Sequence, residues 1–446
     1  MSPEDSTTSL PLVKSTYKNL FILGFAFFCN FTAFNALNNL QSSIHEDKNI
    51  GLASLSVIYA SIVISCLFIP PVFINKWGYK YTIVCSISGY IFYTVAHLYP
   101  TWWLFMTASV IIGICAAPLW NAKASYLTTM ALHHASSGKK NKDAVITSFF
   151  SIFFMTFQLS QVSGNSLSSL ILKETFDTSN STNESSLCGS AYCPSTPIVS
   201  TNQQTEHSTV VTLIAIYIAF GGTALLSVLL FLNNIEMKNK ETNSKNIIKK
   251  AFQSLRDWRM VFLMPVSAYT GMASGFVSAD FTEAYVTCSI GIQKVGLMMI
   301  TYGASNAASS YVVGAVTKLV GRPAVICGAT VFNVGIIAWL HHWEPVFSHV
   351  FFLTACALGI IDAVWQTQTY AYFGILFHSN KEIAFSINQL FRSFGNTVAF
   401  AYGDYLCVSH KLYILVCVLI ISVILYGVVE FTDRKKVAAP ERDFLL

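Results

Sequence analysis

Charged residues are scarce in this chain of 446 residues, of which only 11% are Asp, Glu, Lys or Arg. Soluble domains carry about 25% charged residues. Because 53% of the residues are hydrophobic, this composition excludes a water-soluble globular protein. The shortage of charge instead predicts a protein that is embedded in a lipid bilayer.

Patterns that carry catalysis or bind cofactors are missing as well. The sequence has no Ser/His/Asp or Cys/His grouping at a supporting spacing, no phosphate-binding loop and no His-rich cluster. Its formal net charge is +5, but the basic residues form no module with interleaved aromatic residues. We therefore expect no enzyme activity, no cofactor, no bound metal and no nucleic acid partner.

Long apolar runs are abundant. A helix needs about 20 apolar residues to cross a bilayer, and helices are expected because every backbone polar group must be satisfied inside the membrane. The expected fold class is an all-α membrane protein with twelve transmembrane helices in two six-helix repeats. The predicted helices cover residues 18–41, 52–74, 80–99, 101–130, 144–172, 209–233, 260–288, 293–316, 323–341, 346–374, 382–408 and 411–431.

The distribution of Lys and Arg predicts the orientation. Of the 27 such residues, two lie within apolar segments, 21 lie on one side of the predicted membrane, and four lie on the other. These four are Lys48, Lys173, Lys294 and Lys411. Because positively charged loops stay on the cytoplasmic side, both termini are expected to be cytoplasmic.

The predicted organisation has two membrane halves between polar segments. We expect a cytoplasmic tail, a first half that includes an outer loop at 173–208, a cytoplasmic linker, a second half and a second cytoplasmic tail. Their boundaries are 1–17, 18–233, 234–259, 260–431 and 432–446.

A short polar link that occurs twice indicates that the halves arose by duplication. The first copy surrounds Gly78, and the second surrounds Gly321, 243 residues later. Tyr59 precedes the first glycine by 19 residues, and Tyr302 precedes the second glycine by the same distance. The equal spacing predicts that the two halves have the same helical register.

The link resembles the signature between the second and third helices of major-facilitator transporters. Gly78 and Lys80 fit it, and Lys76 stands for a basic residue, but Asn75 occupies the position of the expected acid. In the second copy Gly321 and Arg322 fit, and a lysine takes the acid position. An acid there would favour the helix N-terminus and pair with cations. The link therefore supports the transporter fold more strongly than it supports transport.

The predicted outer loop contains two sequons, at Asn180 and Asn183, and two cysteines, Cys188 and Cys193. Exposed Asn-X-Ser/Thr triplets outside the cell accept glycans, so we expect modification of this loop. A close cysteine pair in an oxidising compartment predicts a small disulfide loop. Zinc is the weaker alternative because no histidine pair accompanies the cysteines.

Asp362 and Arg392 fall at similar depths in two predicted helices. A charge inside a bilayer costs about 2.5–3.5 kcal/mol or more unless it has a partner or water. We expect these residues to face each other, directly or through a polar neighbour. A structural ion pair and a substrate site are both consistent with this placement.

Other polar residues within the apolar segments leave alternatives open. Lys123 either extends to the lipid headgroups or points into a central cavity, and Asp280 is either part of an outer gate or an exposed acid at a helix end. Interhelical hydrogen bonds and a hydrated cavity both account for the amides, with the cavity preferred. The candidate amides are Asn30, Asn35, Asn121 and Gln366.

Five sequence runs together resemble the Unc ninety-three family over about residues 18–431. They are Asn39-Leu40-Gln41-Ser42-Ser43, Phe68-Ile69-Pro70-Pro71, Ala117-Pro118-Leu119-Trp120-Asn121-Ala122-Lys123, Asp362-Ala363-Val364-Trp365-Gln366-Thr367-Gln368 and Lys411-Leu412-Tyr413-Ile414-Leu415. The resemblance implies a glycosylated membrane protein with a major-facilitator-like fold. It also implies a regulatory partner of a potassium channel, since that is the founding role of the family.

Two functional hypotheses follow. The first is a non-catalytic regulatory or trafficking partner of a channel, and the second is a transporter of a small solute through a polar central cavity. The expected location is the plasma membrane, with an endosomal or lysosomal membrane as the alternative. The C-terminal residues Glu441, Leu445 and Leu446 resemble an acidic dileucine sorting signal.

Overall fold

The computed structural model describes residues 16–44, 48–99, 101–172, 188–193, 207–235, 253–254, 256–291, 294–343, 348–403 and 405–442. Within these residues every regular element is a helix. The sequons at Asn180 and Asn183 lie outside the described residues, as do Leu445, Leu446 and the Glu441 side chain.

The first five long helices form what we call the N-terminal bundle. They are α2 (Thr16–Ile44), α3 (Lys48–Ala96), α4 (Trp102–Ser137), α5 (Lys142–Leu172) and α6 (His207–Phe231). Two of the predicted segments are joined in α3, which is broken at Gly78 by a non-helical backbone conformation.

The remaining long helices form the C-terminal bundle. Its first helix continues from α8 (Trp258–Phe276) through the π-helix η4 (Val277–Thr287) into α9 (Cys288–Ile290). It is followed by α10 (Val295–Val320), α11 (Arg322–His342), α12 (Ser348–Leu376), α13 (Lys381–Ala401) and α14 (Val408–Arg442). Two short 3-10 turns, η3 (Gly189–Ala191) and η6 (His378–Asn380), lie in connections.

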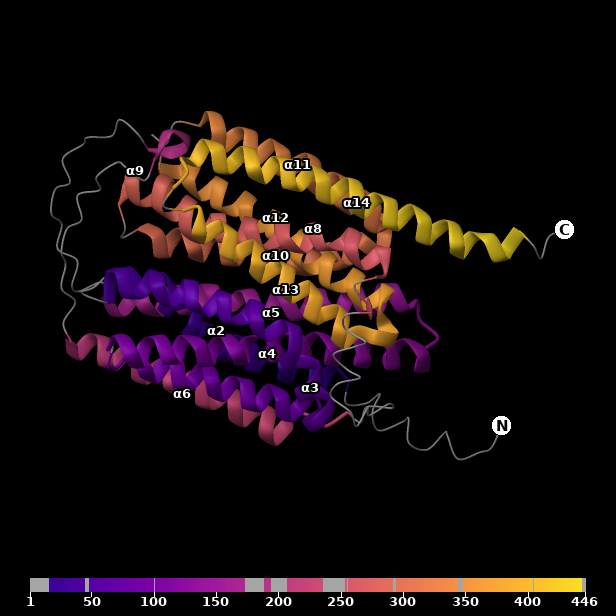
Figure 1. Ribbon diagram of the computed structural model, residues 1–446, viewed down its shortest axis with the longest axis horizontal. Helices are drawn as coiled ribbons and strands as arrows, with labels where there is room; N and C mark the ends of the chain where they lie inside the picture. Colours follow the sequence, from indigo (N-terminus) through magenta and orange to yellow (C-terminus); the bar gives the residue numbers. More distant parts are fainter. Residues whose placement is uncertain are drawn as a thin grey trace.

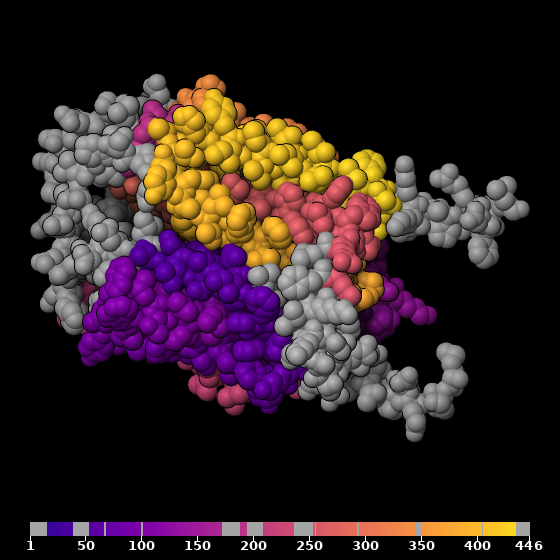
Figure 2. All heavy atoms as spheres, in the orientation of Figure 1, coloured from indigo at the N-terminus to yellow at the C-terminus, as the bar shows by residue number. Residues whose placement is uncertain are grey.

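The two bundles lie side by side with their helices roughly aligned (Figure 1). Helix α5 packs against α10 and α12, and α13 packs against α3 and α4. On the face seen in Figure 2, the atoms of the two bundles meet along one boundary. These four helix pairs define the region in which side chains of both bundles come together.

Eight of the described helices are long and apolar enough to cross a membrane. The bent pair Ala53–Cys66 and Phe68–Ala96 brings the number to nine if it counts as one span. Helices α10 and α13 are not among them, and both carry polar side chains that contact the neighbouring helix α12. The chain is therefore a multi-pass membrane protein.

Candidate functional site between the two helical bundles

One face of α12 carries the centre of the site. Asp362, Gln366 and Tyr370 are spaced four residues apart, so they lie on successive turns of the same helical face. Their contacts reach α4, α5, α10 and α13. Together they form a polar ladder of three steps that is parallel to the helix axis.

Asp362 is held by α10 and not by the arginine on α13. Its Oδ2 accepts hydrogen bonds of 2.8 Å from the Tyr302 hydroxyl and of 2.8 Å from Asn306 Nδ2. Among the ion pairs of the described residues, none joins Asp362 to Arg392. The direct form of the expected contact is therefore not formed, because α10 supplies two neutral donors to the carboxylate. The alternative, a contact through a polar neighbour, stays a prediction.

Arg392 instead faces Gln366, one turn along α12 from Asp362. With the amide oriented so that its oxygen faces the guanidinium, that oxygen lies 2.8 Å and 3.2 Å from the two terminal nitrogens of Arg392. Such amide orientations are assigned from the surrounding hydrogen-bond groups. The Gln158 amide of α5 lies 3.3 Å from the Gln366 amide, so this step connects both bundles.

Close packing of α8 on α13 fixes the position of Arg392. A Cβ added at Gly271 would overlap the Arg392 carbonyl, and one added at Gly395 would overlap the Ala268 carbonyl. Glycine therefore permits the two backbones to touch, as small residues do in membrane helix pairs. Arg392 is thereby held at the level of Gln366.

Lys123 lies at the third step, against Tyr370. Its side chain is completely buried, and its Nζ has no hydrogen-bond partner. Four aromatic rings surround it at centroid distances of 4.2–4.7 Å. The alternative in which Lys123 extends to the headgroups is wrong, because α5 and α12 enclose the ammonium group on the inside of the protein.

A proline five residues earlier in α4 is accommodated by the neighbouring helix. Pro118 lacks the N–H group that would bond to the Ile114 carbonyl. That carbonyl accepts a hydrogen bond of 3.0 Å from the Ser65 hydroxyl on α3. The freed backbone group is therefore satisfied inside the membrane, as it must be.

We call the end of the bundles that carries Gly78 and Gly321 the link end. There the first link contacts α13. The Tyr79 hydroxyl donates to Glu382 Oε1 at 2.5 Å. Asn121 of α4 donates to the Glu382 carbonyl at 2.6 Å and to the Ser386 hydroxyl at 2.5 Å. Asn121 is therefore a contact between the bundles and does not line an open cavity in this conformation.

The second link contacts the N-terminal bundle through Arg322. Arg322 is buried, lies 3.7 Å from Glu430 of its own bundle and lies 3.9 Å from Asp143 of α5. Its guanidinium also lies 4.6 Å from the centre of the Tyr372 ring. The residue that follows each link glycine thus contacts the other bundle.

The two link glycines have the same unusual backbone conformation. Gly78 has φ 77° and ψ 174°, and Gly321 has φ 84° and ψ 159°. This region is essentially restricted to glycine. Of the flanking basic residues, Lys76 is exposed and lies 5.8 Å from the centre of the Trp77 ring, whereas Lys80 is half-buried. Asn75 is half-buried and has a partner.

At the opposite end, the cysteine pairing differs from the prediction. Cys188 is bonded to Cys288, and Cys193 is bonded to Cys407. The predicted bond between Cys188 and Cys193 is wrong because the segment between them forms η3, which packs on the C-terminal bundle and brings each cysteine to a different helix end. The bonds attach a loop of the N-terminal half to the C-terminal bundle.

Noncovalent contacts support the same attachment. The Tyr192 carbonyl accepts from the Val408 amide at 3.0 Å, and its hydroxyl donates to Glu283 at 3.2 Å. Burial and the nearby carboxylate raise the pKa of the Tyr192 phenol above its ordinary value. Ser190 donates to the His341 carbonyl at 2.8 Å.

Asp280 is not an exposed acid. Its Oδ1 lies 2.5 Å from Lys411 Nζ, and both side chains are almost fully buried. Lys411 also donates to the Gly403 carbonyl at 3.0 Å. The pair joins the π-helix η4 to α14, and π-helical segments are often found at functional sites.

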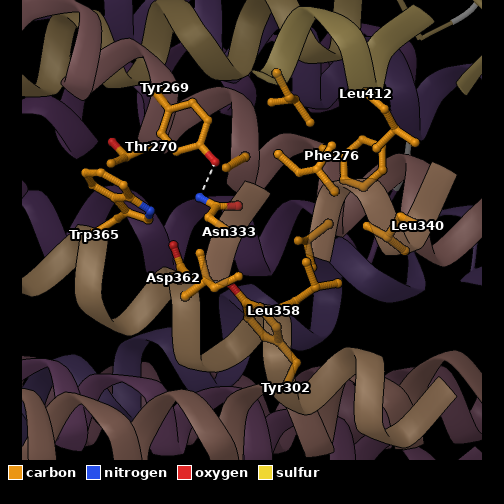
Figure 3. A pocket seen from close by; sticks show the side chains of 15 residues that line it. Tyr269, Thr270, Phe276, Tyr302, Asn333, Leu340, Leu358, Asp362, Trp365 and Leu412 are labelled. Carbon is orange, nitrogen blue, oxygen red and sulfur yellow. Dashed lines mark hydrogen bonds between the residues drawn. The ribbon is translucent and has the colours of Figure 1, made fainter. Parts of the chain in front are cut away.

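A small cavity lies inside the C-terminal bundle next to Asp362 (Figure 3). Asn333 donates to the Tyr269 hydroxyl at 2.5 Å, and the Trp365 indole N–H, which has no partner, points towards the same space. The space that the centre of a water molecule can occupy in this cavity is about 30 Å³. The cavity therefore has room for about two waters. It is too small for a solute in this conformation.

The remaining candidate amides lie within the N-terminal bundle. Asn30 is buried and its amide has no hydrogen-bond partner. Asn35 donates to the Ser160 hydroxyl of α5 at 3.1 Å, which is an ordinary interhelical contact. Among the described residues, no group of three or more His, Cys, Asp or Glu side chains is placed to hold a metal ion.

Sequence comparison identifies the family. Residues 43–426 match the family described as ion channel regulatory protein UNC-93. The chain belongs to the UNC-93 family. This UNC-93 chain is 39% identical over 439 residues to protein unc-93 homolog A of Xenopus laevis, covering 95% of each chain. It is 35% identical over 435 residues to the Homo sapiens homolog A, again covering 95% of each.

A more distant relative has a functional name. This is the putative potassium channel regulatory protein unc-93 of Caenorhabditis elegans, 29% identical over 452 residues. The match covers 97% of this UNC-93 chain and 64% of the worm protein.

Solved structures show that the fold is that of major-facilitator transporters. The fucose:proton symporter FucP of E. coli, a major facilitator superfamily member solved in the outward conformation, aligns with a TM-score of 0.65 and 13% identity. That alignment covers 93% of this chain and 99% of the symporter. The human organic anion transporter MFSD10 aligns with a TM-score of 0.63 and 11% identity over 92% and 99% of the chains.

Proposed function

We propose that this UNC-93 protein is a non-catalytic regulatory or trafficking partner of an ion channel, of the potassium-selective class. The observation that carries the proposal is family membership over nearly the whole chain, in a family described as ion channel regulatory proteins. The worm relative, named as a putative potassium channel regulatory protein, supports the choice of channel. The partner is therefore another membrane protein in the same bilayer.

The closed packing between the bundles supports this role over transport. Polar groups of the two bundles bind one another there: the Gln158 amide lies 3.3 Å from the Gln366 amide, and Asn121 binds the start of α13. The neighbouring cavity has room for about two waters. A protein that acts by contact with a channel does not require an open solute path.

We also propose twelve membrane crossings in two six-helix repeats, with both termini in the cytoplasm and the halves bounded at 18–233 and 260–431. The matching conformations of Gly78 and Gly321 support the repeat, and the excess of Lys and Arg on one side supports the orientation. The plasma membrane is the proposed location, because a surface channel is the expected partner.

The test is electrophysiology on cells that express a panel of potassium channels with and without the full chain. We expect the current density or gating of at least one channel to change and that channel to co-purify with the chain. Unchanged currents across the panel, with the protein present in the same membrane, would contradict the proposal. Surface labelling of the channel separates a trafficking effect from a change in gating.

Transport of a small solute remains a second candidate because ionisable groups line the region between the bundles. Lys123 and Arg392 both lie there, and buried charges in membranes are commonly functional. Purified protein in liposomes distinguishes the two roles. Solute-dependent flux that Arg392→Gln abolishes would favour transport, whereas absent flux combined with altered channel currents would favour regulation.

A further inference from the structure

The surroundings of Lys123 are those of a cation-binding site. The Nζ atom lies 4.5 Å from the centroid of Trp120, 4.5 Å from that of Phe153, 4.7 Å from that of Phe154 and 4.2 Å from that of Tyr370. We call these four rings the aromatic cage. The side chain is 0% exposed, and Nζ has no hydrogen-bond partner among the described residues.

Neighbouring acids do not account for this arrangement. The Asp362 carboxylate lies two turns from Tyr370 on α12. It accepts hydrogen bonds from Tyr302 and Asn306. Among the ion pairs of the described residues, none includes Lys123. The π faces of the rings are therefore the electrostatic partners of this side chain. Aromatic rings attract cations within about 6 Å of their centroids, most strongly where water is excluded.

We propose that the aromatic cage is a recognition site for small alkylammonium cations and that Lys123 occupies it as a tethered ligand. Clusters of rings around a nitrogen that makes no hydrogen bonds recognise quaternary ammonium groups. The lysine ammonium fills the same space from inside the protein. An external cation gains access to the cage only when Lys123 is shortened.

The cage belongs to both bundles. Trp120 lies on α4, Phe153 and Phe154 lie on α5, and Tyr370 lies on α12 of the C-terminal bundle. Lys123 therefore contacts both bundles through one group and stabilises their closed arrangement. This inference goes beyond the proposed regulatory role and holds whether or not a channel partner is found.

The test uses the full chain in lipid nanodiscs and the variant Lys123→Ala. Thermal unfolding is followed with tetramethylammonium or choline, and with 3,3-dimethylbutan-1-ol as the uncharged analogue of choline. We expect the cations to raise the melting temperature of the variant by about 2 °C or more in a saturable way. The wild-type protein and the neutral alcohol should show no such rise.

Matched variants test the role of the rings. Lys123→Ala combined with Tyr370→Leu should lose the response to tetramethylammonium, whereas Lys123→Ala combined with Tyr370→Phe, which retains the ring, should keep it. An equal response to choline and to the alcohol would overturn the proposal, because it would indicate a purely apolar pocket. No response in folded Lys123→Ala protein would also overturn it.

If Lys123→Ala does not fold, a double-mutant cycle with Lys123→Met and Tyr370→Leu replaces it. Met has a similar length and no charge, so it removes the cation–π contact while it fills the space. We expect the two substitutions to be coupled, with the combined loss of melting temperature clearly smaller than the summed single losses. Simple additivity would overturn the proposal.

Discussion

Four cations in the described part of the chain, of which Arg392 is only partly buried, have different sets of partners. Lys411 binds a carboxylate, Arg322 lies between two carboxylates and a ring, Arg392 faces an amide, and Lys123 is surrounded by aromatic rings. A charge within a membrane needs a partner, but several kinds of group can serve. The choice of partner at each site determines how a substitution there acts.

The Asp280–Lys411 pair offers a direct test at this scale. Lys411→Met leaves a buried carboxylate without its counter-ion, so we expect a loss of stability of about 3–5 kcal/mol in thermal unfolding. Adding Asp280→Leu should restore most of that loss. Lys294→Met, at an exposed lysine near the same end, is the control and should change little. Equal effects of the two lysine substitutions would contradict a buried pair.

The link glycines are required for their backbone conformation. Gly78→Ala and Gly321→Ala should each destabilise the protein by about 1–3 kcal/mol, although the space around each Cβ is free of close contacts. Gly427 is the control, because a Cβ added there would meet no neighbouring atom within 4 Å and its backbone is ordinary helix. Gly427→Ala should be neutral or slightly stabilising. The comparison requires only the unfolding temperatures of the three variants.

At the scale of elements, the two links act as reciprocal contacts. Tyr79 follows Gly78 and binds α13, and Arg322 follows Gly321 and approaches α5. The duplicated backbone therefore places a side chain at the same point in each half, directed at the other half. At this point the first copy has an uncharged hydroxyl and the second copy has a guanidinium group.

The contact between Tyr79 and Glu382 can be measured with a double-mutant cycle. Tyr79→Phe should lower stability by about 1–2 kcal/mol because it removes a hydrogen bond to a charged group. Combined with Glu382→Ala, the loss should be less than the sum of the single losses. Tyr81→Phe, at a half-exposed tyrosine nearby, should have little effect. Additive losses would show that the two groups do not interact.

The loop segment that contains η3 is attached to the C-terminal bundle by both of its cysteines. Cys188→Ser should expose Cys288 to a thiol-specific label, and Cys193→Ser should expose Cys407. Mass spectrometry of non-reduced peptides should find the bonds Cys188–Cys288 and Cys193–Cys407. Labelling of Cys193 after Cys188→Ser would instead indicate a local bond within the loop.

At the scale of the whole molecule, the bundles are held at both ends and in the middle. Tyr79 and Arg322 connect them at the link end, Lys123 and Gln366 connect them between, and disulfides attach an N-terminal loop at the far end. The fold is that of a transporter, but these connections favour one closed arrangement. That arrangement suits a protein that presents a fixed surface to a partner.

The proposed topology also has a direct test. If residues 173–208 lie outside the cell, Asn180 or Asn183 should carry a glycan. Treatment with an endoglycosidase should then increase the electrophoretic mobility of the protein from cells. The variant Asn180→Gln with Asn183→Gln should migrate at the treated position without the enzyme. An unshifted wild-type band would count against an outer location of this loop.

The sequence predicted where each site residue lies along its helix, but it did not predict contacts between helices that are distant in the sequence. Depth along a helix placed Asp362 and Arg392 at one level, but it could not show that Tyr302 and Asn306 of α10 reach the carboxylate first. No local pattern identified Phe153 as a neighbour of Lys123 either. An aromatic residue in an apolar run is expected equally for ordinary core packing.

The sequence by itself determined the membrane class, the apolar segments, the repeated links and the family, since all of these depend on composition, periodicity or residue identity along the chain. Only the tertiary structure decided the partners of Lys123, Asp362 and Lys411 and the pairing of Cys188 and Cys193. These depend on which helices pack together. A buried charge accepts whichever suitable group the neighbouring helix presents, and the sequence around the charge does not specify that neighbour.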